Sequence, residues 1–407
     1  MTAERAEQQV LALLAERERD VVELTRELVA APSPNPPGDE RKAAEVARQA
    51  MTVLGYGKVE TIARAENRPN VVGEVEAGAG RTLILNGHLD TKPPGDEAEW
   101  ETGPYDPVVR DCRLSGLGSA DMKGAVAAMI HAGGALAEAG ALSGTLKVVL
   151  TADEEAGSSC GAAYLADMIE ADAVLVGEPT GIESGWEYVA VASRGVSCFD
   201  VRTFGTQMHS SLSDRLHCVN ASVKLARVLV RFADDFRPTH EEQPATGSPT
   251  LNPGVLLRGG VFYGVYPGQA EFGVDVRTVP GMTLERLQAE VQLFLDGLRA
   301  DDPELDVTAR WVEDLAWFPP CAIDPAHPLV AAARSAGETV LARELPLGTM
   351  PAATDGSYWA GAGKPCVPAF GPGLLPLAHR PNESVSVPEI VEASRIFALT
   401  ALRYLRS

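Results

Sequence analysis

Hydrophobic and polar positions in the first half of the chain follow two periods, one typical of amphipathic helices and one typical of buried strands. Apolar residues recur at helical spacing near the N-terminus, and small apolar residues fill 124–139. Short runs of branched apolar residues lie between such segments and predict buried strands. The predicted helices are about 4–30, 39–54, 124–139 and 161–170, and the predicted strands are 70–76, 81–86, 145–151 and 172–176. Strands that alternate with helices in this way are typical of a largely parallel α/β sheet.

The pattern changes from about residue 184. Apolar and polar residues then alternate, as they do in antiparallel strands with one exposed face. The elements predicted from here on are strands at 188–193, 196–203, 250–257, 270–278 and 366–370 and helices at 217–235, 283–299, 328–342 and 388–405. We therefore expect a mixed, largely parallel α/β sheet with helices on both faces, formed by 1–183 and 313–407. A smaller two-layer α+β domain at 184–312 would interrupt it.

Composition and charge narrow the function classes. The 407 residues are 45% hydrophobic and 22% charged, which is ordinary for a globular protein and excludes a mainly disordered chain. Lys and Arg number 35 against 56 Asp and Glu, a net charge of −21, so nucleic-acid and anionic-membrane partners are not expected. No uncharged apolar stretch reaches the length of about 18 residues that a membrane-spanning helix needs. Six scattered cysteines without a C-x-x-C pair favour reduced thiols and a cytoplasmic protein.

Polar clusters follow the apolar strands, which is where α/β folds place their ligands. Taken singly, each has a simpler interpretation, such as a surface histidine, a helix cap or a solvated helix start. Together they favour one site, because buried consecutive carboxylates need cations to neutralise them. Histidines and carboxylates without a thiolate suit zinc, cobalt or manganese. The clusters are GHLD at 87–90, SADMKG at 119–124, ADEEAG at 152–157, GEPT at 177–180 and AHRPNE at 378–383.

These motifs, extended to GLGSADMKG at 116–124 and ADEEAGS at 152–158, resemble those of the dizinc aminoacylase and carboxypeptidase family. That family includes acetylornithine deacetylase, succinyl-diaminopimelate desuccinylase, carboxypeptidase G and related dipeptidases. The resemblance spans about residues 30–400. It implies a metal-dependent hydrolase that cleaves the amide bond of N-acyl amino acids or short peptides. It also implies two divalent metal ions as cofactors, zinc first, with cobalt or manganese as alternatives.

The resemblance implies a role for each residue of the site. Five residues would be metal ligands: His88 and Glu178 for one ion, Glu155 and His379 for the other, and Asp121 as the bridge between both. Asp90 would orient His88 from behind. Glu154 would be the general base that takes a proton from a water molecule between the metals and delivers it to the leaving nitrogen.

Three residues of the inserted domain also match the family's pattern. His209, in segment 205–211, would stabilise the tetrahedral oxyanion from a neighbouring subunit, so a homodimer is expected. Asn252 would contact the substrate, and Arg277 would bind a substrate carboxylate with its forked guanidinium. The expected partner is therefore a small molecule with a free carboxylate. From the residues alone, His209 also fits an ordinary loop, and Arg277 fits a charge on a solvated sheet face.

Several alternatives stay open at this point. Segment 116–118 (GLG) is similar to acetylornithine deacetylases, whereas 354–356 (TDG) is similar to desuccinylases and dipeptidases, so the acyl group and the amine are undecided. Segment 157–161 (GSSCG) fits the G-x-S-x-G pattern of a serine hydrolase with Ser159 as nucleophile, although the preceding strand ends about eight residues before Ser159. A non-catalytic binding protein on the same fold is a further alternative, but we would expect it to have lost some ligands or the base.

Overall fold

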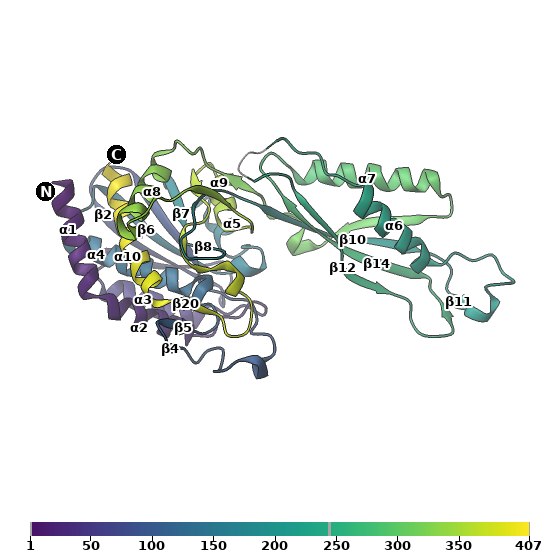
Figure 1. The fold of residues 1–407 in the computed structure, drawn as a ribbon, viewed down its shortest axis with the longest axis horizontal. Helices are drawn as coiled ribbons and strands as arrows, with labels where there is room; N and C mark the ends of the chain where they lie inside the picture. Colours follow the sequence, from purple (N-terminus) through teal and green to yellow (C-terminus); the bar gives the residue numbers. More distant parts are fainter. Residues whose placement is uncertain (1, 243–245, 407) are drawn as a thin grey trace. The chain divides into compact units, whose positions relative to one another are not determined.

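The structure is a computed structural model that describes residues 2–242 and 246–406 and divides into two units (Figure 1). The first unit is Met1–Ser193, Cys321–Met350 and Thr354–Ser407, and the second is Arg194–Pro320 with Pro351–Ala353. The second unit is therefore an insertion in the sequence of the first.

The boundaries of these units lie later in the chain than the expected positions, 183/184 and 312/313. Residues Val189–Ser193, expected in the insertion, form strand β9. This strand pairs with β16 (Cys321–Ala322) and β17 (Leu347–Met350) and so belongs to the first unit. Alternation of apolar and polar residues indicates a strand but does not tell which sheet the strand joins.

A six-stranded sheet in the order β1-β2-β6-β3-β7-β18 is the centre of the first unit. Strands β6, β3, β7 and β18 are parallel to one another, whereas β1 and β2 are antiparallel to their neighbours. The prediction of a mixed, largely parallel sheet is confirmed. The strands are β1 (Lys58–Ala63), β2 (Pro69–Ala77), β3 (Thr82–His88), β6 (Gly144–Thr151), β7 (Ala173–Val176) and β18 (Cys366–Val367).

Helices cover both faces of this sheet, as predicted. Successive strand residues point to opposite faces, so Leu83 and Leu85 join one core and Ile84 joins the other. The helices of the first core are α1 (Ala3–Glu16), α2 (Glu18–Val29), α3 (Arg41–Val53), α4 (Gly124–Ala139), α8 (Pro328–Leu341) and α10 (Val387–Arg406); those of the second are α5 (Ala162–Leu165) and α9 (Gly356–Gly361).

Two predicted helices differ from the structure. The helix expected at 4–30 is two helices, α1 and α2, that meet at Arg17. No side chain between Leu14 and Val21 is buried. Packing against the core therefore does not keep the residues around Arg17 in one helix continuous with α1 and α2. The helix expected at 161–170 is reduced to the short α5.

Smaller sheets and turns complete the first unit. The strands are β4 (Val108–Arg110), β5 (Arg113–Ser115) and β20 (Ser384–Ser386) in one sheet and β8 (Pro179–Gly181) and β19 (Gly371–Leu374) in another. Short helical turns of the two units lie at Glu97–Glu99, Ser119–Lys123, Glu154–Ala156, Ser210–Leu212, Glu313–Leu315 and Leu375–Leu377. Within the described ranges, no helix combines the length and the apolar character that crossing a bilayer requires.

The second unit is a two-layer structure, as its sequence pattern predicts. Its antiparallel sheet has the order β12-β14-β10-β15, and Phe199, Phe232 and Phe272 lie in the core that its strands form with two helices. The elements are β10 (Gly195–Phe204), β12 (Thr250–Gly259), β14 (Gln269–Thr278), β15 (Asp306–Trp311), α6 (Ala221–Asp235) and α7 (Leu284–Asp301), with a small ribbon of β11 (Met208–His209) and β13 (Val265–Tyr266). Among the strands of the six-stranded and four-stranded sheets, β1 and β15 were not predicted.

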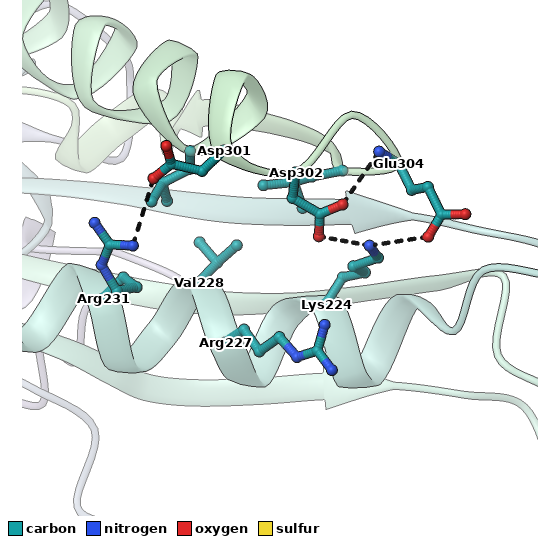
Figure 2. Close-up of a pocket in the computed structure, with 9 residues that line it drawn as sticks. Lys224, Arg227, Val228, Arg231, Asp301, Asp302 and Glu304 are labelled. Atoms are coloured by element: carbon teal, nitrogen blue, oxygen red, sulfur yellow. Dashed lines mark hydrogen bonds and ion pairs between the residues drawn. The ribbon is translucent and has the colours of Figure 1, made fainter.

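A groove of about 440 Å³ lies along α6, between this helix and the chain around the end of α7 (Figure 2). Lys224 Nζ lies 2.5 Å from Asp302 Oδ2 and 3.4 Å from Glu304 Oε2. Arg231 lies 3.6 Å from Asp301. With Arg227, the groove has three cations against three carboxylates and so no net charge. These ion pairs connect two elements of the second unit.

Candidate metal centre

Adjacent parallel strands β6, β3 and β7 end at one edge of the central sheet. His88 is the last residue of β3, Glu155 lies in the turn after β6, and Glu178 is the second residue after β7. Because the carboxyl ends of parallel strands form the ligand-binding edge of such sheets, these side chains lie together there. Asp121 comes from the helical turn before α4, and His379 comes from the loop between β19 and β20.

Asp121 stands between the two histidines. Its Oδ1 lies 2.9 Å from His88 Nε2, and its Oδ2 lies 3.1 Å from His379 Nε2. A second carboxylate accompanies each imidazole: Glu178 Oε1 is 3.5 Å from His88 Nε2, and Glu155 Oε1 is 3.0 Å from His379 Nε2. The structure thus brings together two groups that share Asp121, and each of them could hold a metal ion.

Asp90 fixes the orientation of both the strand end and the neighbouring turn. His88 Nδ1 lies 3.0 Å from the Asp90 carbonyl oxygen, and donation of its proton there leaves Nε2 free to act as a ligand. The Asp90 carboxylate is fully buried and accepts the backbone N–H groups of Glu154 at 3.2 Å and Glu155 at 3.1 Å. Asp90 therefore contacts the imidazole of His88 at the ring nitrogen that does not face Asp121.

A chain of buried polar groups continues behind Asp90. Asn35 Nδ2 donates to Asp90 Oδ2 at 2.8 Å and to Asp153 Oδ1 at 3.1 Å. Arg68 donates to the same Asp153 oxygen at 2.8 Å, and its Nε lies 2.9 Å from Glu40 Oε2. Neither Asn35 nor Arg68 belongs to a motif with predicted chemistry. Asp153 was part of the carboxylate run but had no assigned role.

Glu154 differs from its neighbour Glu155 in having no partner. Its carboxylate is half-buried and makes no hydrogen bond or ion pair with any described residue. Burial and the nearby negative charge of Glu178 raise its pKa well above the ordinary value. Glu155, in contrast, accepts the backbone N–H of Lys92 at 3.1 Å and pairs with the Lys92 ammonium at 3.2 Å. Lys92 is a cation of this region that no motif predicted.

The electrostatics of the cluster favour additional positive charge. Burial, together with the charge of Asp121, raises the pKa of Glu178 to about 7. Burial also raises the pKa of Asp355 to about 6, although Ser158 and Thr151 donate to it at 2.5 and 2.6 Å. Burial opposes the charged form of His379, but bonds with Asp121 and Glu155 raise its pKa to about 11. A cation relieves this mutual repulsion of carboxylates.

His209, Asn252 and Arg277 lie in the second unit and are described only within it. His209 is exposed, and its Nδ1 accepts the Ser211 hydroxyl at 2.8 Å. Asn252 is exposed on β12, opposite Asp275. The Arg277 guanidinium binds both oxygens of Asp275 at 3.0 Å, so here it acts as a paired charge on the sheet.

The serine-hydrolase alternative lacks its essential contact. The Ser159 hydroxyl donates to Asp153 Oδ2 at 2.8 Å rather than to a histidine. The Nε2 atoms of His88 and His379 both face carboxylates. A serine nucleophile needs a base within hydrogen-bond reach, and among the described residues Ser159 has no such base.

Comparisons with known proteins agree with this centre. Residues 84–403 match the profile of Peptidase family M20/M25/M40. The chain is 27% identical over 421 residues, covering 96% of both chains, to N-formyl-4-amino-5-aminomethyl-2-methylpyrimidine deformylase of Bacillus subtilis (strain 168). It is 31% identical to succinyl-diaminopimelate desuccinylase of Xanthomonas euvesicatoria pv. vesicatoria (strain 85-10), covering 72% of this chain and 76% of the relative.

The fold also has solved counterparts. The di-peptidase Dug1p from Saccharomyces cerevisiae superimposes with a TM-score of 0.77 at 16% identity, covering 100% of both chains. At that identity the likeness concerns the fold alone. The desuccinylase is one of the proteins whose motifs the sequence resembles, and the family profile covers most of the chain. The predicted family resemblance is therefore confirmed, and the chain belongs to Peptidase family M20/M25/M40.

Proposed function

We propose that the protein is a dinuclear metal-dependent hydrolase that cleaves the amide bond of N-acyl amino acids or short peptides. The observation that carries the proposal is Asp121, whose two oxygens face two different histidines, each with a further carboxylate beside it. Membership of a family of metallo-hydrolases that act on amides or peptides supports the coarser statement. Relatives named as a deformylase and a desuccinylase support amide hydrolysis of a small molecule.

The residues of the centre fit divalent cations. Ligand atoms about 2.0–2.2 Å from a tetrahedral ion lie roughly 3.3–3.6 Å apart. The imidazole nitrogens and carboxylate oxygens here are already 2.9–3.5 Å apart. Nitrogen and oxygen ligands without a thiolate suit zinc, with cobalt or manganese as alternatives. His88, Asp121 and Glu178 would hold one ion, and Asp121, Glu155 and His379 the other.

Glu154 is the proposed general base. Cations at this centre would polarise the amide carbonyl and lower the pKa of water to about 7. The Glu154 carboxylate has no partner among the described residues, and Asp90 holds its backbone N–H in place. One of its oxygens takes a proton from the attacking water and then delivers that proton to the leaving nitrogen, so that an amine departs.

Residues of the second unit would bind the substrate. His209 would stabilise the oxyanion from a neighbouring subunit by donating a hydrogen bond to it, because its Nδ1 accepts from Ser211 and the other ring nitrogen carries the hydrogen. Asn252 would contact the substrate amide. Arg277 would exchange Asp275 for the free carboxylate of the substrate and keep its bidentate geometry.

A homodimer through the second unit agrees with its exposed apolar residues. Strand β12 is at the edge of its sheet, where unpaired backbone groups can join another strand. Val255, Leu256 and Leu257 on this strand and Val223 and Val230 on α6 are between 46% and 64% exposed. Sedimentation equilibrium of the full chain tests this assembly. The six unpaired cysteines support the proposed cytoplasmic location.

The proposal is tested by a substrate panel on chelated enzyme with zinc, cobalt or manganese added back. The panel contains N-acetylornithine, N-succinyl-diaminopimelate, N-formyl amines, other N-acyl amino acids and dipeptides. We expect turnover of at least one class only after a cation is restored. A serine-directed fluorophosphonate should leave that turnover unchanged, and full inhibition by it would overturn the metal mechanism.

Glu154→Gln tests the base directly. We expect kcat to fall about 10²- to 10⁴-fold while the cation content stays at the wild-type level, because the carboxylate moves a proton and is not a ligand. Kinetics and elemental analysis of the same sample measure both quantities. Glu170→Gln, which changes an exposed glutamate of the same unit, is the matched control and should behave like the wild type. Unchanged turnover in Glu154→Gln would remove Glu154 from the mechanism.

A further inference from the structure

Glu383 closes the AHRPNE motif, is 1% exposed and has no part in the mechanism described so far. Its Oε1 accepts the backbone N–H groups of Ala120 at 2.8 Å and Asp121 at 3.1 Å, and its Oε2 accepts that of Gly118 at 3.0 Å. All three donors belong to the turn that carries Asp121. One buried side chain therefore accepts three backbone N–H groups at the start of this turn.

The backbone around Glu383 also pairs with the segment that leads to this turn. The carbonyl oxygen of Glu383 accepts the N–H of Gly116 at 2.9 Å. Strand β20, which begins at the next residue, pairs with β5, and residues 116–118 join β5 to the turn. Glu383 also lies four residues after His379. The same loop therefore carries His379, a ligand of one group, and Glu383, which bonds to the turn of Asp121, the ligand that both groups share.

We propose that Glu383 is a positioning residue that keeps Asp121 in the orientation in which its two oxygens face the two histidines. The inference rests on the proposed function. Gly118 has a φ of 80°, in the left-handed region, and the turn it begins has no side-chain bond of its own to Asp121 N–H. Without an acceptor, three N–H groups in a buried turn would seek other partners, and the turn would rearrange. The affinity for both cations should then fall together, because Asp121 is common to both ligand groups.

Glu383→Gln tests the inference. An amide has one acceptor oxygen, so its NH₂ group must face a backbone donor in either orientation. We expect the folded variant to bind each of two Co²⁺ ions about 10- to 100-fold more weakly than the wild type, in calorimetric titration of the metal-free full chain. The visible absorption of the bound cobalt should also change, which loss of stability alone would not cause. Glu389→Gln is the matched control, because Glu389 also accepts one backbone N–H, that of Gly373 at 2.8 Å, and this N–H does not belong to the turn that carries Asp121.

A second variant guards against a folding defect. Glu383→Asp keeps the charge but is one methylene shorter, and we expect a smaller loss in affinity for both cobalt ions. Three outcomes would overturn the role of Glu383. They are wild-type cobalt affinity and absorption in the folded variants, a fall in affinity for one ion only, or an equal fall in Glu389→Gln. In those outcomes the wild type still binds two ions. A wild-type chain that binds no cobalt would instead overturn the proposed function, and this inference with it.

Discussion

The two halves of the candidate centre have the same kinds of ligand and very different surroundings. The buried half, His88 and Glu178, is 1% and 4% exposed and lies at the ends of central strands. The open half, Glu155 and His379, includes an imidazole that is 44% exposed on a loop, at a residue whose φ is 60°. A positive φ in a residue other than glycine is strained and persists only where its surroundings fix it. The ends of central strands thus position the ligands of the buried half, whereas a loop positions the histidine of the open half.

Support behind the two histidines differs in the same way. His88 Nδ1 is directed by Asp90, which is joined through Asn35 and Asp153 to Arg68. Among the described residues, none makes a hydrogen bond to His379 Nδ1. A ligand with such support is fixed before a cation arrives, whereas an unsupported one can adjust to the cation or the substrate. We therefore expect the buried half to bind its cation more tightly.

Replacing Arg68, the positively charged side chain among the buried polar groups behind Asp90, should have the largest effect on stability. In Arg68→Met, the buried carboxylates of Asp153 and Glu40 lose their only ion-pair partner among the described residues. Breaking a buried pair on one side costs about 3–5 kcal/mol of unfolding free energy. Chemical denaturation at pH 8 measures the loss. Arg41→Met is the matched control, because Arg41 pairs with Asp39 on the surface and such pairs contribute only about 0–1 kcal/mol. Equal losses in the two variants would mean that the chain behind Asp90 contributes little.

The histidines themselves give a smaller and more local contrast. His88→Ala opens a buried space beside Glu178 and Asp121, while solvent can replace the exposed imidazole in His379→Ala. We expect affinity for the corresponding cation to fall by at least about 100-fold in the first variant and by roughly 10-fold in the second. Elemental analysis after stepwise dialysis against a chelator measures both. Similar losses would show that burial does not distinguish the two halves.

The sequence patterns predict the ligands better than their supports. Strands such as β3 and β6 are continuous apolar runs, so their ends and the polar residues after them can be recognised locally. Arg68 touches Asp153, 85 residues further along the chain, and Asn35 touches Asp90, 55 residues away. Such contacts arise only when the chain has folded, and neither residue lies in a run with a recognisable period. Local patterns also fail within a recognised element. The single helix expected at 4–30 has the correct period, but the period does not reveal that the helix is interrupted at Arg17.

A pH-dependent effect is expected of Glu40, which lies at the far end of the buried polar groups behind Asp90. Burial, with the charge of Asp90 in addition, raises its pKa to about 7 despite the nearby Arg68. The folded state then holds a proton that the unfolded state has already lost between pH of about 4.5 and about 7. Stability from this group is complete below that window and is lost as the pH rises through it, with a slope of at most about 1.4 kcal/mol per pH unit. Glu40→Gln keeps the neutral shape, so denaturation between pH 5 and 8 should show its unfolding free energy rising relative to the wild type. Glu23→Gln, on the surface beside Arg26, should run parallel to the wild type, and a parallel Glu40→Gln would mean that Arg68 keeps Glu40 ionised throughout.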